Sequence, residues 1–282
     1  IHLFGVSLGF GTRLNWPDDY FTLSTSLSYH RYKLKNWSYF IMTDGVANNL
    51  SLELTLGRSS IDNPIYTRSG SSFSLSCELT PPYSAISGKS YEGAPDSEKY
   101  KWLEYHKWKF KARLFTPLTP DQKLVLMTRV EYGFLGYYNP NRRSPFGTFY
   151  VGGDGMSGGY SSYQTEIVGL RGYASGSLTP YTETGGYNGN LYTRISLELR
   201  YPILLSGSTT IFALAFVEGG NCWSEFKDFN PFDLKRSAGV GVRLFLPMFG
   251  LMVVDWGYGF DIVKNTPSYS GSHFSFIIGQ EF

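Results

Sequence analysis

The sequence predicts an all-β fold, more specifically a transmembrane antiparallel β-barrel, from three observations. Apolar and polar residues alternate with a period of two through segments of about 9 to 14 residues. Strands of soluble proteins have about 5 to 6 residues, whereas a tilted strand that crosses a bilayer needs about 9 to 11. The connectors alternate between short and long, and 17% charged residues is low beside the roughly 25% of soluble proteins.

About eleven segments carry the strand pattern, and no segment predicts a helix. In chain order they are 6–14, 21–30, 50–57, 72–79, 107–114, 124–132, 191–201, 211–219, 238–246, 251–260 and 273–282. In the fifth segment an apolar row faces one way, and four cations face the other: Lys107, Lys109, Lys111 and Arg113.

The connectors fall into two sets, as turns and loops do at the two rims of an outer-membrane barrel. The shorter set is 15–19, 59–71, 118–121, 202–208 and 247–250; the longer set is 34–47, 82–103, 138–190, 222–234 and 261–272. The longest connector is rich in Gly, Ser and Tyr, and a connector of this length is either functional or disordered. We expect it to be ordered and folded into the lumen.

The strand number predicts that this chain holds only part of a barrel. Single-chain bacterial barrels have an even number of strands, and an open sheet edge in lipid leaves backbone groups unpaired. Because about eleven is odd, further strands are expected before Ile1. The predicted domain is therefore a partial outer-membrane barrel over 1–282, with a lumen-folded loop at about 138–190.

The last strand has a mainly aromatic face that carries Phe274, Phe276, Ile278 and Phe282. Gly279 lies on the other face and permits a kink. An aromatic C-terminal strand resembles the signal by which outer-membrane proteins are recognised for insertion. The alternative reading is simply an amphipathic last strand.

Along the strands 191–201 and 211–219, the apolar residues alternate with polar ones and are expected to face lipid. The residues between them, which include Glu198 and Glu218, would then face the lumen. A turn centred near 207–208 would set these two glutamates opposite one another, where like charges are destabilising. Arg171, beside Gly172 in the long loop, is the predicted cation for a forked contact with both. In the alternative, Arg194 or Arg200 pairs with them and the loop lies in solvent.

The sequence has no motif or charge pattern typical of nucleic-acid binding, nucleotide binding, metal binding or catalysis. A net charge of +2 does not suggest a nucleic-acid partner, and the glycine-rich stretch 152–159 lacks the Lys-Ser/Thr of a phosphate loop. The four histidines, His2, His30, His106 and His273, show no metal spacing and no catalytic companion motif. We therefore expect no enzyme activity, no catalytic or metal-ligating residue and no cofactor, and we expect Cys77 and Cys222 to be free thiols.

The motif Leu170-Arg171-Gly172-Tyr173, with 146–153 before it, resembles the VRGF or VRGY loop motif of the BamA family. Further matches follow in the family's order at 196–198, 217–220 and 237–241, and then in the aromatic last strand. Leu170 replaces the usual Val, Glu218 stands where many relatives have Asp, and 156–166 is an insertion that separates the Gly152-Gly153 block from the Arg171-Gly172-Tyr173 motif.

The resemblance implies a barrel of about sixteen strands, preceded by periplasmic POTRA domains, in the outer membrane of a Gram-negative bacterium. It implies the central subunit of a machinery that folds and inserts nascent β-barrel proteins through a lateral seam by strand augmentation. Accessory periplasmic and lipoprotein subunits and the lipid bilayer would be its other partners. The seam half in this chain would be 272–282. The alternatives are a related protein-secretion barrel and, with less support, a porin.

Overall fold

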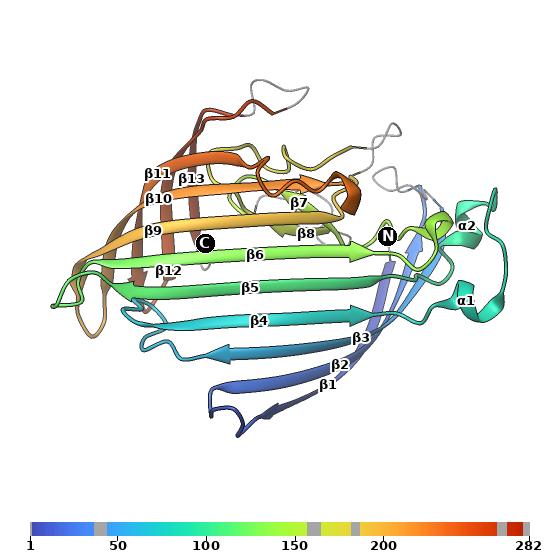
Figure 1. Ribbon diagram of the computed structural model, residues 1–282, viewed down its shortest axis with the longest axis horizontal. Helices are drawn as coiled ribbons and strands as arrows, with labels where there is room; N and C mark the ends of the chain where they lie inside the picture. Colours follow the sequence, from blue (N-terminus) through green and yellow to red (C-terminus); the bar gives the residue numbers. More distant parts are fainter. Residues whose placement is uncertain (1, 37–43, 157–164, 182–186, 264–269, 279–282) are drawn as a thin grey trace.

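Eleven long strands form one curved antiparallel sheet in the computed structural model, which describes residues 2–36, 44–156, 165–181, 187–263 and 270–278 (Figure 1). The strands are β1 (His2–Arg13), β2 (Phe21–Leu34), β3 (Gly45–Ser59), β4 (Gly70–Leu79), β5 (His106–Pro117), β6 (Val125–Gly136), β9 (Leu191–Leu205), β10 (Thr210–Trp223), β11 (Lys235–Leu246), β12 (Gly250–Gly259) and β13 (Ser272–Ile278). Each strand pairs with the next in this order, so the predicted all-β antiparallel fold and its eleven strands are confirmed.

The long loop between β6 and β9 contains two strands that the alternation does not predict. β7 (Thr148–Val151) and β8 (Thr165–Val168) pair in parallel, apart from the main sheet. They have four residues each, too few for a periodic signal, and β7 is buried throughout. They give the loop an ordered framework inside the curve of the sheet (Figure 1).

The expectation that the chain has no helix is wrong in detail. The connector between β4 and β5 contains α1 (Tyr83–Ser87) and α2 (Asp96–Lys99), and single 3-10 turns lie at Pro140–Arg142 and Phe226–Asp228. Each has five residues or fewer, below the length at which helical periodicity shows in a sequence. None of the described helices is long and apolar enough to cross a membrane.

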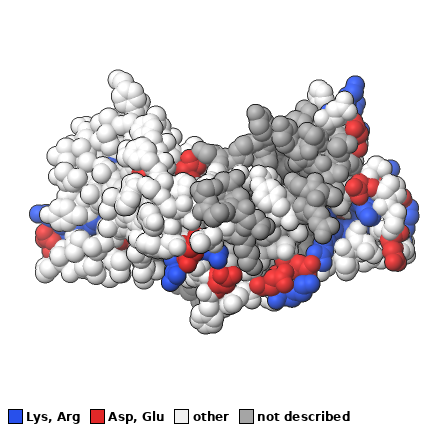
Figure 2. Space-filling model, turned by 90° about the horizontal axis from the view of Figure 1, so that it is seen from above, with Lys and Arg blue, Asp and Glu red and all other residues white. Residues whose placement is uncertain are grey.

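The two faces of the sheet differ in polarity. Along β9, Leu197 and Leu199 are exposed, whereas Ser196, Glu198 and Arg200 are buried on the inner face. The broad surface at the left of Figure 2 is almost without charged residues apart from a small group at its far left edge, and further charges gather at the right-hand end and the lower edge. An apolar outer face with a polar interior is the arrangement of a transmembrane barrel wall.

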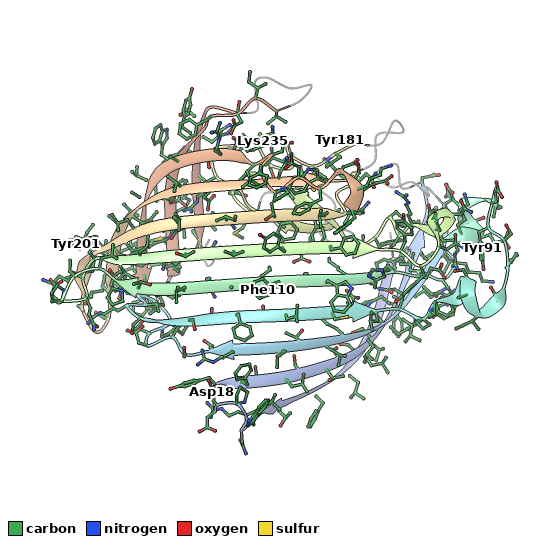
Figure 3. The ribbon with its side chains drawn as sticks, viewed as in Figure 1. Asp18, Tyr91, Phe110, Tyr181, Tyr201 and Lys235 are labelled. Carbon is green, nitrogen blue, oxygen red and sulfur yellow. The ribbon has the colours of Figure 1, made fainter. Side chains whose placement is uncertain are left out.

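The two ends of the sheet also differ. Tyr91 lies at the end that carries α1 and α2, Tyr201 lies at the opposite end beside the short turns, and Phe110 lies between them (Figure 3). Near the long-connector end, apolar residues of the loop pack with residues of the strands, including Tyr32 against Phe146 with ring centroids 4.6 Å apart. A second core, which includes Phe115, Met127 and Phe212, fills the interior toward the short turns.

Candidate functional site

The loop motif is held by backbone hydrogen bonds within the loop itself. The Gly152 amide donates to the Val168 carbonyl at 2.9 Å, and the Leu170 amide donates to the Gly153 carbonyl at 3.0 Å. These bonds continue the β7–β8 pair up to the motif and leave Leu170 fully buried. The loop therefore presents Arg171 from a rigid base.

Arg171 is the centre of a buried ion network. Its Nη2 lies 2.6 Å from Glu198 Oε1 and 2.6 Å from Glu218 Oε1. Its backbone amide donates to Glu218 Oε2 at 3.0 Å, so Glu218 binds both the side chain and the main chain of the motif. All three side chains are almost completely buried. The contact that the sequence predicts between the loop arginine and the two glutamates is present.

The register between β9 and β10 differs from the expected one. Glu198 pairs with Phe216 and Glu218 pairs with Ser196, so the two glutamates are diagonal neighbours and do not face each other directly. A bulge at Ile211/Phe212 shifts the register near the turn. The Phe216 ring between them lies 3.6 Å from the Arg171 guanidinium, a cation–π contact that alternation alone does not predict.

The alternative partners also bind, in addition to Arg171. Arg194 Nη2 lies 2.8 Å from Glu218 Oε1, and Arg200 Nη2 lies 2.8 Å from Glu198 Oε2. Three arginines thus surround two glutamates, and Ser196 donates a further hydrogen bond to Glu218 at 2.9 Å. Charges buried this deeply persist only when they are paired and hydrogen-bonded.

Two further charged residues of the network were missed from the sequence. Arg243 on β11 makes a two-point contact with Asp255 on β12, at 2.7 Å and 3.0 Å. Asp255 Oδ2 also lies 3.5 Å from Arg171 Nη1. The signal was available, because Asp255 is the one charged residue in an inward row of apolar and glycine residues.

Gly172 lets the loop approach the wall closely. Its φ is +86°, and a Cβ there would lie 2.8 Å from the Gly259 amide nitrogen and 2.9 Å from the Ser237 Cβ. The neighbouring Tyr173 is buried, and its hydroxyl donates to the Arg236 carbonyl at 2.6 Å. Burial raises the pKa of Tyr173 to about 12. The motif is thus anchored to β11 and β12 as well as to β9 and β10.

Glu166 on β8 forms a second anchor on the other side of the lumen. Its carboxylate lies 2.9 Å from Lys107 Nζ, 3.2 Å from Lys109 Nζ and 3.7 Å from Lys111 Nζ. Burial by itself would raise the pKa of Glu166, but the lysine charges outweigh it and lower the pKa to about 2. Glu166 ends the segment that interrupts the resemblance to the BamA family, and its role was not predicted.

The last strand lies at the edge of the sheet. Phe274, Phe276 and Ile278 share the outer face and are 70%, 56% and 55% exposed. Gly279 and Phe282 lie outside the described residues. Among the residues that the structure describes, no three His, Cys, Asp or Glu side chains form a group that could hold a metal ion.

Comparison with known proteins gives two findings. The Omp85 superfamily domain matches residues 2–282. A solved structure, the crystal structure of BamA from Haemophilus ducreyi lacking POTRA domains 1-3, is similar with a TM-score of 0.65 at 18% identity. The similarity covers 97% of this chain and 53% of that chain, so this chain spans about half the length of that structure.

LpxR from Salmonella typhimurium covers 96% of this chain and 85% of its own at 10% identity, but its TM-score is only 0.33. No curated protein matches the sequence significantly. The superfamily match over nearly all residues, together with the shared barrel fold, leads to one conclusion: the chain belongs to the Omp85 superfamily.

Proposed function

We propose that this chain forms part of the barrel of the central subunit of an outer-membrane assembly machinery, which folds and inserts other barrel proteins. The superfamily as a whole serves protein insertion and translocation at the outer membrane. The observation that carries the proposal is the clamp of Arg171 on Glu198, Glu218 and Asp255. This clamp holds β9, β10 and β12 together from the inside of the barrel. The wall would therefore keep its shape while a substrate strand pairs at the edge of the sheet.

The edge strand β13 is the proposed working surface. It pairs with β12 on one side, and among the described strands none pairs with its other side. Free backbone N–H and C=O groups on such an edge accept an incoming strand through main-chain hydrogen bonds, which do not depend on the sequence of the incoming strand. Substrate strands would add at this lateral seam, with Phe274, Phe276 and Ile278 facing lipid.

The proposal implies partners and a location. Nascent outer-membrane β-barrel proteins are the substrates, and periplasmic or lipoprotein subunits assist. The site of action is the outer membrane of a Gram-negative bacterium, with the remaining barrel strands and POTRA domains on the N-terminal side of this chain.

A protein-secretion barrel of the same superfamily is the second candidate. It is favoured by a cavity of about 600 Å³ that the loop leaves in the lumen. A porin is less well supported, since a simple pore does not need a buried network that anchors a loop to several strands.

Depletion of the protein in its host tests the proposal. Unrelated outer-membrane barrels should fall in abundance and accumulate as protease-sensitive precursors, and re-expression should restore them. A secretion barrel predicts instead that other barrels stay at normal levels while one exported protein is lost. That second pattern would reject the assembly role.

A further inference from the structure

The lumen contains a cationic cavity that the proposed function does not use. It has a volume of about 600 Å³ and lies between the in-folded loop and the inner wall of β1 to β6, with Arg194 of β9 and Ile277 of β13 also lining it. Its lining carries six cations: Arg13, Arg58, Lys111, Arg113, Arg129 and Arg194. Among the residues that the structure describes, two acidic residues line it, Glu131 and Asp154. Several lining residues come from strand ends next to the short turns, so the cavity extends toward that rim.

Ion pairs with described residues involve four of these cations. Arg58 contacts Asp18 and Arg194 contacts Glu218, each at 2.8 Å. Arg129 lies 3.9 Å from Glu131, and Lys111 lies 3.7 Å from Glu166. Arg113, in contrast, makes no ion pair with any residue that the structure describes. It lies directly opposite Arg129 in the β5–β6 register, and like charges in that position are destabilising.

The cations of β5 form a regular ladder. Lys107, Lys109, Lys111 and Arg113 occupy alternate positions, which places neighbouring side chains about 6.6–6.8 Å apart. Alternate side chains of any extended peptide have the same repeat. A strand with carboxylates at every second residue would therefore match the ladder charge for charge.

The chain itself provides an example of such a contact. Glu166, on the short extended strand β8, binds the upper three rungs of the ladder. Its distances lengthen from 2.9 Å at Lys107 to 3.7 Å at Lys111, and Lys111 is still about half exposed. Lys111, which makes the longest of these three contacts, and Arg113 both line the cavity, where a second carboxylate can pair with them.

We propose that this cavity binds an extended acidic segment of polypeptide, through carboxylates that pair with Lys111 and Arg113. Ser72 and Ser74, paired with these two residues on β4, supply hydroxyl groups beside the charges. The inference deepens the proposed function, on which it rests for the source of the peptide: substrate segments rich in alternating Asp or Glu enter the lumen from the short-turn rim.

The test uses the intact protein in detergent and a fluorescent peptide of alternating Glu and Thr. We expect the peptide to bind at least about tenfold more tightly than its Gln/Thr counterpart, and binding to weaken with salt. Lys111→Gln with Arg113→Gln should weaken binding roughly tenfold, since two partly solvated ion pairs are lost. Lys123→Gln, an exposed cation in the short turn after β5, is the matched control and should leave binding unchanged.

A crosslink locates the peptide. In a protein whose own thiols are removed by Cys77→Ser and Cys222→Ser, a thiol-reactive acidic peptide should label Ser74→Cys, which lines the cavity, and spare Leu75→Cys, the next residue on the outer face. Equal binding of the Gln/Thr peptide, or unchanged binding by the double variant, would overturn the inference. Displacement by inorganic phosphate at matched ionic strength would overturn it in favour of a phosphate site.

The peptide test and the depletion test fail independently. If the peptide binds but other barrels survive depletion, the cavity site stands and the assembly role falls. If depletion removes other barrels but the peptide does not bind, the assembly role stands and the cavity site falls.

Discussion

Arg171 joins three strands because one guanidinium offers several donors in a fixed plane. Glu198, Glu218 and Asp255 come from β9, β10 and β12, and each lies within 3.5 Å of its nitrogens. A lysine in its place would supply a single point charge without the fork. Contact with all three carboxylates therefore requires an arginine, and requires it at position 171.

Replacing Arg171 by alanine should destabilise the protein strongly. The change leaves buried carboxylates without their shared cation, a loss of about 3 to 5 kcal/mol in the free energy of unfolding. Urea unfolding in lipid vesicles and resistance to protease would measure it. Arg236→Ala is the control, because Arg236 pairs with Asp261 on the surface and its removal should change little. Equal protease resistance of the Arg171 variant and the wild type would count against the clamp.

Glu166 should make the second anchor sensitive to acid. Its pKa is about 2 in the folded protein against an ordinary 4.5, so its stabilising contribution is complete above about pH 4.5. The contribution is lost as the pH falls through about 2. The protection of β8 amides against hydrogen exchange, taken relative to the intrinsic exchange rate at each pH, should fall in the wild type between pH 5 and pH 2.5.

Glu166→Gln supplies the comparison for the acid experiment. This variant cannot titrate at position 166, so the protection of its β8 amides, relative to the intrinsic exchange rate, should be low at every pH in the range. If its pH profile matched that of the wild type, Glu166 would not be the group responsible.

The loop as an element docks only because its backbone reaches the wall at Gly172. Gly172→Ala would add a Cβ within 3 Å of atoms of Ser237, Tyr258 and Gly259, at a φ of +86°. The positive φ costs about 1 to 2 kcal/mol and the overlap about 1 to 3 more. Unfolding in urea should show both losses.

Gly250→Ala separates the two causes in the same assay. Gly250 has a similar φ of +75° but open space around it. Its alanine variant should therefore lose only the stability that the positive φ costs, without the cost of steric overlap. Equal losses at the two positions would mean that close approach of the loop to the wall is unimportant.

The long strands were predictable from the sequence, whereas the short elements were not. Alternation in β9 and β10 gives the inner row, and hence Glu198 and Glu218, without coordinates. The diagonal placement of these glutamates depends on a bulge at Ile211/Phe212, which has no periodic signal. The role of Glu166 was not predicted because this residue ends an insertion relative to the BamA family. The four cations at alternate positions of β5 did indicate that a carboxylate should lie opposite them.

On the scale of the whole molecule, the orientation of the wall predicts where a charge is tolerated. Leu54 points outward on β3 and Thr55 points inward, where it bonds to Ser76 at 2.8 Å. Leu54→Arg places a charge in lipid and should cost about 2 to 4 kcal/mol near the bilayer midplane. Thr55→Arg faces the polar lumen and should cost less. Urea unfolding in vesicles compares them, and the reverse order would invert the assigned faces.

The placement of the two anchors has a mechanical consequence. The loop contacts β5 through Glu166, and it contacts β9, β10, β11 and β12 through Arg171 and Tyr173. It therefore links two parts of the sheet that face each other across the lumen. The inner rows of β1 to β4 carry mainly serine, threonine and glycine along their middle, and the loop meets β2 near one end, where Phe146 packs on Tyr32. The sheet thus has a stiff half and a compliant half. A load that bends it is taken up at the compliant half, while the curvature around Arg171 stays fixed.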